Sequence, residues 1–222
     1  MQPNHDDVLD DEQRAGLRER RRRETQRELS DAALDLFEER GVHGTTVDDI
    51  ARRAGTSQRT FFRYFPTKEA AVFASADDSA RVVHDAIEAV RSGATIVEGI
   101  ERSWLNLLDR LDAHPDEHIR TLRVRRVIGT EPSLLALALC NEAEQVEQLT
   151  EAAVAAAGAD ADVVAARATV STLALTLRLT FDEWARRAER NERASVRRIY
   201  GETRRGVAAV ARGLESDPPQ LR

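Results

Sequence analysis

Side chains suited to contact base edges, thymine methyl groups and phosphates are concentrated between residues 57 and 68. They are Ser57, Gln58, Arg59, Thr60, Phe62, Arg63, Tyr64 and Lys68. Arg and Gln read base edges through paired hydrogen bonds, apolar groups contact thymine methyls, and Lys and hydroxyl groups bind phosphates. Phe61 and Phe65 are four residues apart, so on a helix they share a second face. The segment therefore predicts a helix that packs through its phenylalanines and contacts DNA with its outward side chains.

Residue patterns that would indicate enzymatic chemistry do not stand out. The sequence has no G-x-G-x-x-G, P-loop or H-E-x-x-H motif, and none of its five histidines follows a glutamate by three residues, as a di-iron bundle would need. His114 and His118 are four residues apart, but Pro115 between them favours solvated histidines over a metal site. Cys140 lies in a leucine-rich stretch and is expected to be a small core residue. We expect no enzyme, no metal and no cofactor.

The elements that would position residues 57–65 have the spacing of a helix-turn-helix. A first helix ends at Gly41, and a second begins after Thr46, a good N-cap residue. The second helix ends at Gly55, which tolerates the positive φ that a tight turn between crossing helices requires. A third helix then begins after Ser57.

An excess of arginine precedes these helices. The whole chain has 33 Lys and Arg against 39 Asp and Glu, a net charge of −6, so contact with DNA must come from a local basic patch. Residues 14–27 contain seven arginines and two glutamates. The run adds Arg22 and Thr25 to the candidate DNA contacts, although a solvated basic helix face would explain it equally well.

Residues 18 to about 73 closely resemble the TetR (tetracycline-repressor-type) family of regulators. The shared features are Phe-x-x-x-Gly at Phe37–Gly41, the Thr-Val-x-x-Ile-Ala-x-x-Ala-Gly block that starts at Thr46, the Phe-x-Tyr-Phe ending and the following x-x-Lys-Glu. The resemblance implies DNA contacts by Thr46, Gln58, Arg59, Thr60, Phe62, Arg63, Tyr64 and Lys68. Asp48 and Asp49 depart from the family pattern, because a base-contacting arginine is sometimes found there. We therefore expect no base readout from the second helix.

The rest of the chain also predicts helices, because helical periodicity is continuous and strand signals are nearly absent. We expect an all-α protein of about nine helices, with a three-helix helix-turn-helix head and a carboxyl-terminal helical bundle that dimerises. The expected division is a disordered acidic arm (1–16), a DNA-binding domain (17–66), a ligand-binding and dimerisation domain (67–215) and a tail (216–222). The fourth helix is expected to run without a break from Lys68 to about Arg91.

The last two helices are the expected dimer surface. Val163 to Trp184 is apolar on nearly all sides, more than one bundle can cover, and the final helix from about residue 191 to 213 is also amphipathic. The resemblance implies a four-helix homodimer interface built from these segments, which would let two recognition helices read a palindromic operator. The most apolar run, Val163 to Leu177, contains Arg167 and is shorter than the roughly 20 residues that a membrane span needs, so we expect no membrane span and a cytoplasmic protein.

Three arginines lie on helix faces that are otherwise apolar, namely Arg123, Arg126 and Arg178. A buried arginine needs an anion, which here is either an internal carboxylate or a ligand. Pairing of Arg178 with Asp182 or across the dimer, and solvent-reaching side chains for the other two, remain open. Trp104, Leu108 and Leu139 are candidate lining residues of a cavity, with ordinary core packing as the alternative.

Residues 119–135 loosely resemble the body of mycofactocin-type regulators, which implies an acyl-coenzyme A or a similar acyl ligand. Two hypotheses follow for the whole chain. It is either a repressor released from DNA by a small ligand with an anionic group and an apolar part, or a DNA-binding regulator that is switched by a protein partner or does not respond to a ligand.

Overall fold

The computed structural model describes residues 5–73 and 76–214, and this part of the chain consists of ten α-helices and one short 3₁₀ helix without a β-strand. The all-α prediction is therefore confirmed. The chain forms two compact units, residues 1–76 and 77–222. The predicted boundary after residue 66 lies ten residues earlier than this division.

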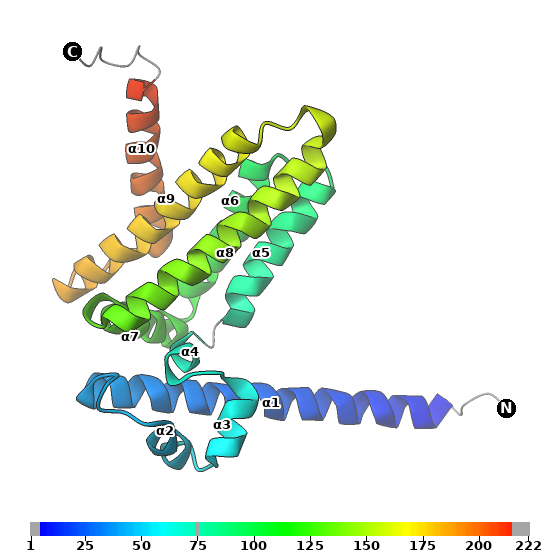
Figure 1. Ribbon diagram of the computed structural model, residues 1–222, viewed down its shortest axis with the longest axis vertical. Helices are drawn as coiled ribbons and strands as arrows, with labels where there is room; N and C mark the ends of the chain where they lie inside the picture. The colour runs from blue at the N-terminus through cyan, green and yellow to red at the C-terminus, as the bar shows by residue number, and fades with distance from the viewer. Residues whose placement is uncertain (1–4, 74–75, 215–222) are drawn as a thin grey trace. The chain divides into compact units, whose positions relative to one another are not determined.

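The amino-terminal unit contains α1 (His5–Arg40), α2 (Val47–Arg53), α3 (Gln58–Tyr64) and α4 (Lys68–Val72). Both α2 and α4 pack against the long α1, and α3 packs against α2 (Figure 1). Their shared core is fully buried at Leu29, Leu34, Ile50 and Phe61. Gly41 and Gly55 have φ values of 76° and 66°, so both turns use the left-handed conformation that glycine adopts without strain.

Two expectations for this region were wrong. The predicted arm, residues 1–16, is helical from His5 onwards as the first part of α1, while residues 1–4 lie outside the described residues. The predicted helix from Lys68 to about Arg91 is not continuous, because α4 ends at Val72 and α5 (Ala76–Arg91) begins separately. This division makes ten α-helices where we expected about nine.

The carboxyl-terminal unit contains α5 and five further α-helices (Figure 1). These are α6 (Ile96–Ala113), α7 (Pro115–Thr130), α8 (Pro132–Ala157), α9 (Val163–Glu189) and α10 (Val196–Leu214). The neighbours of α9 are α8, α10, α7 and α6, so α9 is the central element of the bundle. Its core is built around Ile100, Leu108, Val170, Trp184 and Ile199, each almost inaccessible to solvent.

Candidate nucleic-acid interface

The third helix is fixed from both sides by local contacts. Ser57 is its N-cap, and the Ser57 hydroxyl accepts a hydrogen bond of 3.2 Å from the backbone N–H of Thr60. Phe61 and Phe65 are buried, with ring centroids 5.6 Å apart, and hold the inner face of α3 in the core. The N-cap and the two buried phenylalanines therefore fix the orientation of α3 and of its outer face.

The outer face of α3 combines exposed cationic, amide and aromatic groups. Gln58, Arg59 and Arg63 are exposed, and Phe62 is 56% exposed, which is unusual for a phenylalanine in a small unit with a packed core. The Arg63 guanidinium lies 5.1 Å from the ring centroid of the half-buried Tyr64, a cation–π contact that limits the freedom of both side chains. The face therefore offers donors and apolar groups together, as base edges and thymine methyls require.

Thr46 has a structural role in this unit. Its hydroxyl accepts a hydrogen bond from the backbone N–H of Asp49, and the Asp49 carboxylate accepts hydrogen bonds from the Thr46 N–H (3.1 Å) and hydroxyl (2.6 Å). These hydrogen bonds lower the pKa of Asp49 to about 2. The Arg40 guanidinium, whose Nη2 lies 2.9 Å from Asp49 Oδ2, acts in the same direction. Asp49 therefore caps α2, and the departure from the family pattern at this position has a local structural explanation.

Lys68 also has partners inside the unit. Its Nζ donates to the backbone carbonyls of Val42 at 2.7 Å and Thr45 at 2.8 Å, both in the loop between α1 and α2. Two of its three N–H groups are thus committed, and Lys68 fastens this loop to the start of α4. The sequence indicated a phosphate contact, and only one N–H group remains for it.

The arginines between residues 18 and 23 are exposed on α1. Arg22 and Arg23 both pair with Glu19, at 3.2 Å and 3.0 Å, in contacts between neighbouring turns of the same helix. Such exposed pairs contribute little to stability, so the guanidinium groups stay available to a phosphate. Thr25 is half-buried. The roles of Arg22 and Thr25 in DNA binding remain predictions.

The six candidate ligand residues do not meet in one place. Trp104 and Leu108 are buried in the core of the carboxyl-terminal unit, as the packing alternative predicted. Arg126 is exposed on α7. Arg123 is half-buried and has an interaction within the unit.

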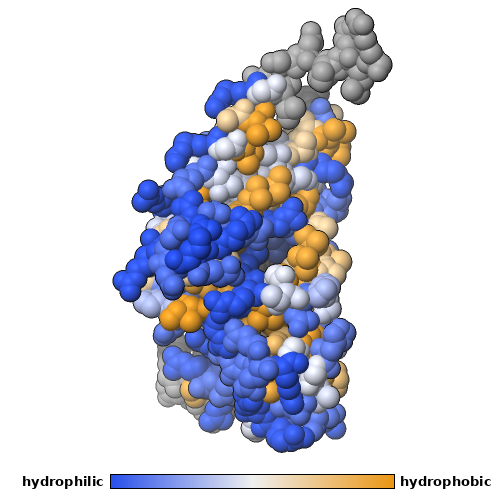
Figure 2. Space-filling view, turned by 90° about the vertical axis from the view of Figure 1, so that its left-hand side faces the viewer, coloured by the Kyte–Doolittle hydropathy of each residue, from blue (hydrophilic) through white to orange (hydrophobic). Residues whose placement is uncertain are grey.

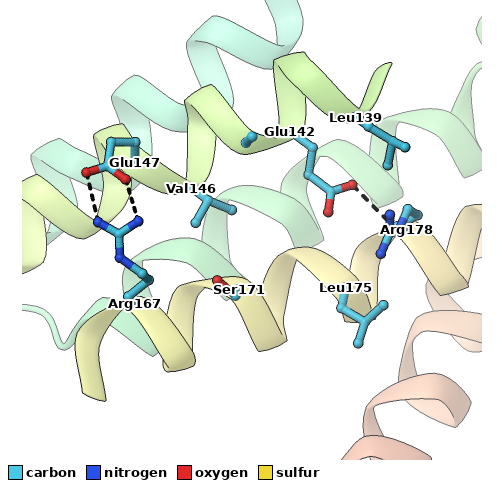
Figure 3. Close-up of a pocket in the computed structure, with 9 residues that line it drawn as sticks. Leu139, Glu142, Val146, Glu147, Arg167, Ser171, Leu175 and Arg178 are labelled. Atoms are coloured by element: carbon cyan, nitrogen blue, oxygen red, sulfur yellow. Dashed lines mark hydrogen bonds and ion pairs between the residues drawn. The ribbon is translucent and has the colours of Figure 1, made fainter. Parts of the chain in front are cut away.

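Leu139 and Arg178 do lie together, in an open groove of about 510 Å³ between α8 and α9 (Figure 3). Two ion pairs cross this groove. Arg167 and Glu147 form a forked pair with N–O distances of 2.8 Å and 3.0 Å, whereas Arg178 Nε lies 3.7 Å from a carboxylate oxygen of Glu142. The anion that we expected near Arg178 is therefore an internal carboxylate, and it is Glu142 instead of Asp182.

Arg125 on α7 was not singled out by the sequence analysis. Its guanidinium carbon lies 4.3 Å from the ring centroid of Phe181 on α9. Burial lowers the pKa of Arg125, while the negative charges of Asp182 and Glu142 act in the opposite direction. The buried positions of α7 are Val124, Val127 and Ile128, so the inward face is rotated relative to the expected one.

Two smaller expectations were also wrong. Cys140 is exposed on α8 and is not a core residue. His118 is not freely solvated, because its ring packs edge-on against Trp184 with centroids 4.6 Å apart. Among the described residues no group of three His, Cys, Asp or Glu side chains could hold a metal ion.

Apolar side chains remain exposed on the helices that we expected to dimerise. On α9, Val164 is 78% exposed, and Leu175 and Leu179 are also exposed on the same side of the helix; on α10, Val210 is exposed. Apolar patches, orange in Figure 2, interrupt the hydrophilic surface of the carboxyl-terminal unit. Leu173, in contrast, packs against the core.

The helix α9 resembles a membrane-spanning helix in its length and its apolar composition. Contrary to our expectation, α9 is long and apolar enough to cross a membrane by these two criteria, and 17% of its most apolar window is buried. The core helix of a soluble protein also satisfies these two criteria. The neighbours of α9 within the unit, α8 and α10, already cover part of it.

Comparison with known proteins decides the family. Residues 29–74, which span the end of α1 through α4, match the family described as bacterial regulatory proteins, tetR family. The chain belongs to the tetR family. This assignment confirms the resemblance that the helix-turn-helix residues indicated.

Two relatives extend the match beyond the head. The putative mycofactocin biosynthesis transcriptional regulator MftR of Mycobacterium tuberculosis is 31% identical over 122 residues, which cover 54% of this chain and 59% of the relative. The HTH-type transcriptional regulator TcmR of Streptomyces glaucescens is 31% identical over 152 residues, 66% of each chain. The matches thus span 59% and 66% of the length of these two relatives.

A solved structure is similar at lower identity. The FadR protein of Thermus thermophilus, a TetR-family transcriptional repressor solved in complex with lauroyl-CoA, is 20% identical, with a TM-score of 0.43 over 89% of this chain and 98% of that one.

Proposed function

We propose that the chain is a transcriptional repressor of the tetR family that binds a palindromic operator as a homodimer in the cytoplasm. The observation that carries this proposal is the outer face of α3, where Gln58, Arg59, Phe62 and Arg63 are exposed while Phe61 and Phe65 anchor the inner face. A recognition helix held in this way enters the major groove and reads base edges with its amino-terminal residues. Enzymatic activity is not part of the proposal, since the relatives described above are named as transcriptional regulators.

The dimer in this proposal is built from α9 and α10. The exposed positions 164, 168, 172 and 179 lie four or seven residues apart and form one stripe along α9. A second copy, related by a two-fold axis, would cover this stripe and bring two recognition helices to a spacing of about one DNA turn, roughly 34 Å. One recognition helix alone contacts too few base pairs to define a specific site, so two copies are needed.

Release from DNA is proposed to follow the binding of a small molecule with an anionic group and an apolar part, with acyl-coenzyme A as a candidate class. The support is the groove between α8 and α9, in which Arg178 lies beside Leu139 and Leu175 (Figure 3). A guanidinium next to apolar side chains matches an amphiphilic anion.

A second candidate is a regulator that is switched by a protein partner or does not respond to a ligand. It is favoured by the packing of the central bundle, where Trp104 and Leu108, expected to line a cavity, are buried in the core instead. Both candidates share the same DNA-binding head.

Selection of binding sequences from random DNA by the purified full-length chain tests the function that both candidates share. We expect an inverted repeat whose half-site centres are separated by about 10 base pairs or a multiple of it. Recovery of no consensus at low salt would contradict DNA recognition by α3. An asymmetric single half-site would contradict the dimer.

A further inference from the structure

The first helix is longer than the packing of the amino-terminal unit requires. Residues 16–28 are exposed or half-buried, and Leu29 is the first buried side chain after them, although α1 is continuous from His5 to Arg40. At about 1.5 Å per residue, Arg18 lies roughly 16 Å before Leu29 along the helix axis. This part of α1, blue in Figure 1, extends past α2 and α3. Its side chains are therefore accessible to a partner beside the helix-turn-helix.

One side of α1 connects the core of the unit with this exposed part. Residues on this side recur every three or four positions, and we call them the inner stripe. They are Arg18, Arg22, Thr25, Leu29, Ala33, Leu36 and Arg40. Arg40 Nη2 lies 2.9 Å from the carboxylate of Asp49 on α2, so the inner stripe faces α2, the helix against which α3 packs. The exposed Arg18 and Arg22 thus continue the side of α1 that faces the helix-turn-helix.

Another side of α1 is acidic. Its carboxylates also recur every three or four residues and are exposed or half-buried, and we call them the acidic stripe. They are Glu24, Glu28, Asp31, Asp35 and Glu38. At 3.6 residues per turn this stripe lies roughly 140° from the inner stripe around the helix. A polyanion beside the inner stripe would therefore meet guanidiniums and avoid these carboxylates.

We propose that Arg18 and Arg22 bind phosphates of the DNA that flanks each half-site, where α1 extends past the recognition helix. This inference rests on the proposed DNA binding by α3 and adds a second, sequence-independent contact to it. Duplex DNA is the partner because the end of the inner stripe is cationic and continuous with the side that faces the helix-turn-helix. Guanidiniums form charge-assisted hydrogen bonds with phosphate oxygens, which position a protein on the duplex without reading bases.

Glu19 competes with the DNA for this contact. One oxygen of its carboxylate lies 3.2 Å from Arg22 Nε and the other lies 3.0 Å from Arg23 Nε. All three side chains are well exposed, and exposed ion pairs of this kind are weak. A phosphate can therefore replace Glu19 at Arg22 when the flanking DNA is bound.

Two double variants that remove the same charge from the same helix test the contact in the full-length chain. The first combines Arg18→Gln with Arg22→Gln. The matched control combines Arg20→Gln with Arg27→Gln, because Arg20 and Arg27 are exposed on the acidic side of α1 and Arg27 Nε lies 3.8 Å from Asp31. Each protein is titrated with the selected operator cut at the outer edges of its half-sites, and with the same operator extended by about 10 base pairs at each end, one DNA turn.

The wild type is expected to bind the extended duplex about tenfold more tightly than the short one at low salt, because more phosphates are neutralised. The variant of Arg18 and Arg22 should lose most of this gain. With two phosphates lost in each of two protomers, its slope of log affinity against log salt concentration should fall by about 3 to 4. The control should lose less than about threefold. All three proteins should bind the short duplex equally, since α3 is unchanged.

Three outcomes would contradict the contact or its basis. Equal losses in the two double variants, or no gain of the wild type from the flanks, would overturn the contact while leaving DNA recognition by α3 intact. A gain confined to A·T-rich flanks would overturn phosphate binding in favour of the minor groove. A wild type that binds neither duplex would contradict the proposed function itself, and this contact with it.

Glu19→Gln provides a test by gain of binding. It should raise affinity for the extended duplex severalfold and leave affinity for the short duplex unchanged, because Arg22 is released from its carboxylate partner. Unfolding cannot produce such a gain, so this variant carries the test if thermal unfolding shows that the variant of Arg18 and Arg22 is destabilised. No gain, or the same gain on both duplexes, would remove Arg22 as a contact to the flanking DNA.

Discussion

Arg59 and Gln58 lie in the first turn of α3, the part of a recognition helix that reaches base edges. Replacing either by alanine should weaken operator binding by about 1–3 kcal/mol and relax base preference at one position, because a bidentate contact to one base pair is lost. Competition binding with operator variants that carry one changed base pair measures both effects. Arg91→Ala, which removes an exposed arginine from α5, is the control for the loss of one positive charge. Unchanged base preference in Arg59→Ala would remove α3 as the reading element.

Lys68 allows a second test at the scale of single residues, because two roles predict different results. If its main role is to hold the carbonyls of Val42 and Thr45, Lys68→Met should lower the free energy of unfolding by about 1–3 kcal/mol, since a charged donor to buried acceptors is lost. The salt dependence of DNA binding should then stay as it is. A phosphate contact predicts the reverse, a salt slope reduced by about one with little change in stability. Urea unfolding and operator binding at several salt concentrations distinguish the two roles.

The arginines of α7 show where sequence reasoning ends. Residue type indicated arginines at an apolar surface in this region; Arg123 is half-buried and Arg126 is exposed, while Arg125, which was not expected, lies against the ring of Phe181. The inward face of a helix with arginines on several sides depends on which helices pack against it, here α8 and α9. That information is not contained in a window of α7 alone.

Helix starts, by comparison, were predictable because capping depends on residues within four positions. The sequence placed helix starts at Thr46 and Ser57, and each of these side chains accepts the hydrogen bond that defines an N-cap. The break after Val72 was not predicted, because residues 68–91 contain no glycine or proline to mark it. Helix boundaries could therefore be predicted from the sequence where a polar side chain caps the helix, and the uncapped break after Val72 could not.

The capping box of α2 gives a pH dependence. The pKa of Asp49 is lowered from its ordinary value of 3.8 to about 2 by its hydrogen bonds with Thr46, so the folded state favours the charged carboxylate. Its contribution to stability is fully present above about pH 4 and is lost as the pH falls through 2. Asp49→Asn should consequently lose less stability than the wild type between pH 5 and pH 2 in urea unfolding. Asp48→Asn, in the same turn but outside the capping box, should follow the wild-type curve; if it matches Asp49→Asn, the capping box is not the cause.

The exposed stripe of α9 predicts the effect of a single charge on assembly. Leu179→Glu should shift the chain from dimer to monomer at micromolar concentration, because a carboxylate would be buried between two copies without a partner. Leu173 is unsuitable for this test, since it packs against the core and its replacement would destabilise the unit. Ile119→Glu, at an exposed apolar position on α7, is the matched control and should remain dimeric. Sedimentation velocity measures all three proteins, and a monomeric wild type would contradict the interface.

At the scale of the whole molecule, the ligand and the operator must influence each other to the same extent. A ligand can release the protein from DNA only through a difference between its affinities for the DNA-bound and the free protein. Decanoate, which has an anionic group and an apolar chain, is a simple probe of the proposed ligand class. Thermodynamic linkage requires that saturating operator weakens decanoate binding by the factor by which decanoate weakens operator binding, typically about 5–150-fold. Calorimetric titration of decanoate into the free chain and into the chain saturated with operator measures one factor. Operator binding with and without decanoate measures the other.

The factor should also depend on Arg178, which lines the groove between α8 and α9. In Arg178→Gln the two measured factors should both fall towards one while operator affinity without decanoate stays at the wild-type level, because the variant changes the ligand site and leaves α3 intact. Arg167→Gln should retain the wild-type factors. Equal decanoate affinity in the presence and absence of operator, in a wild-type chain that binds both, would instead favour the regulator that is switched by a protein partner. In that case the apolar groove and its two arginines would bind a ligand without transmitting it to the DNA.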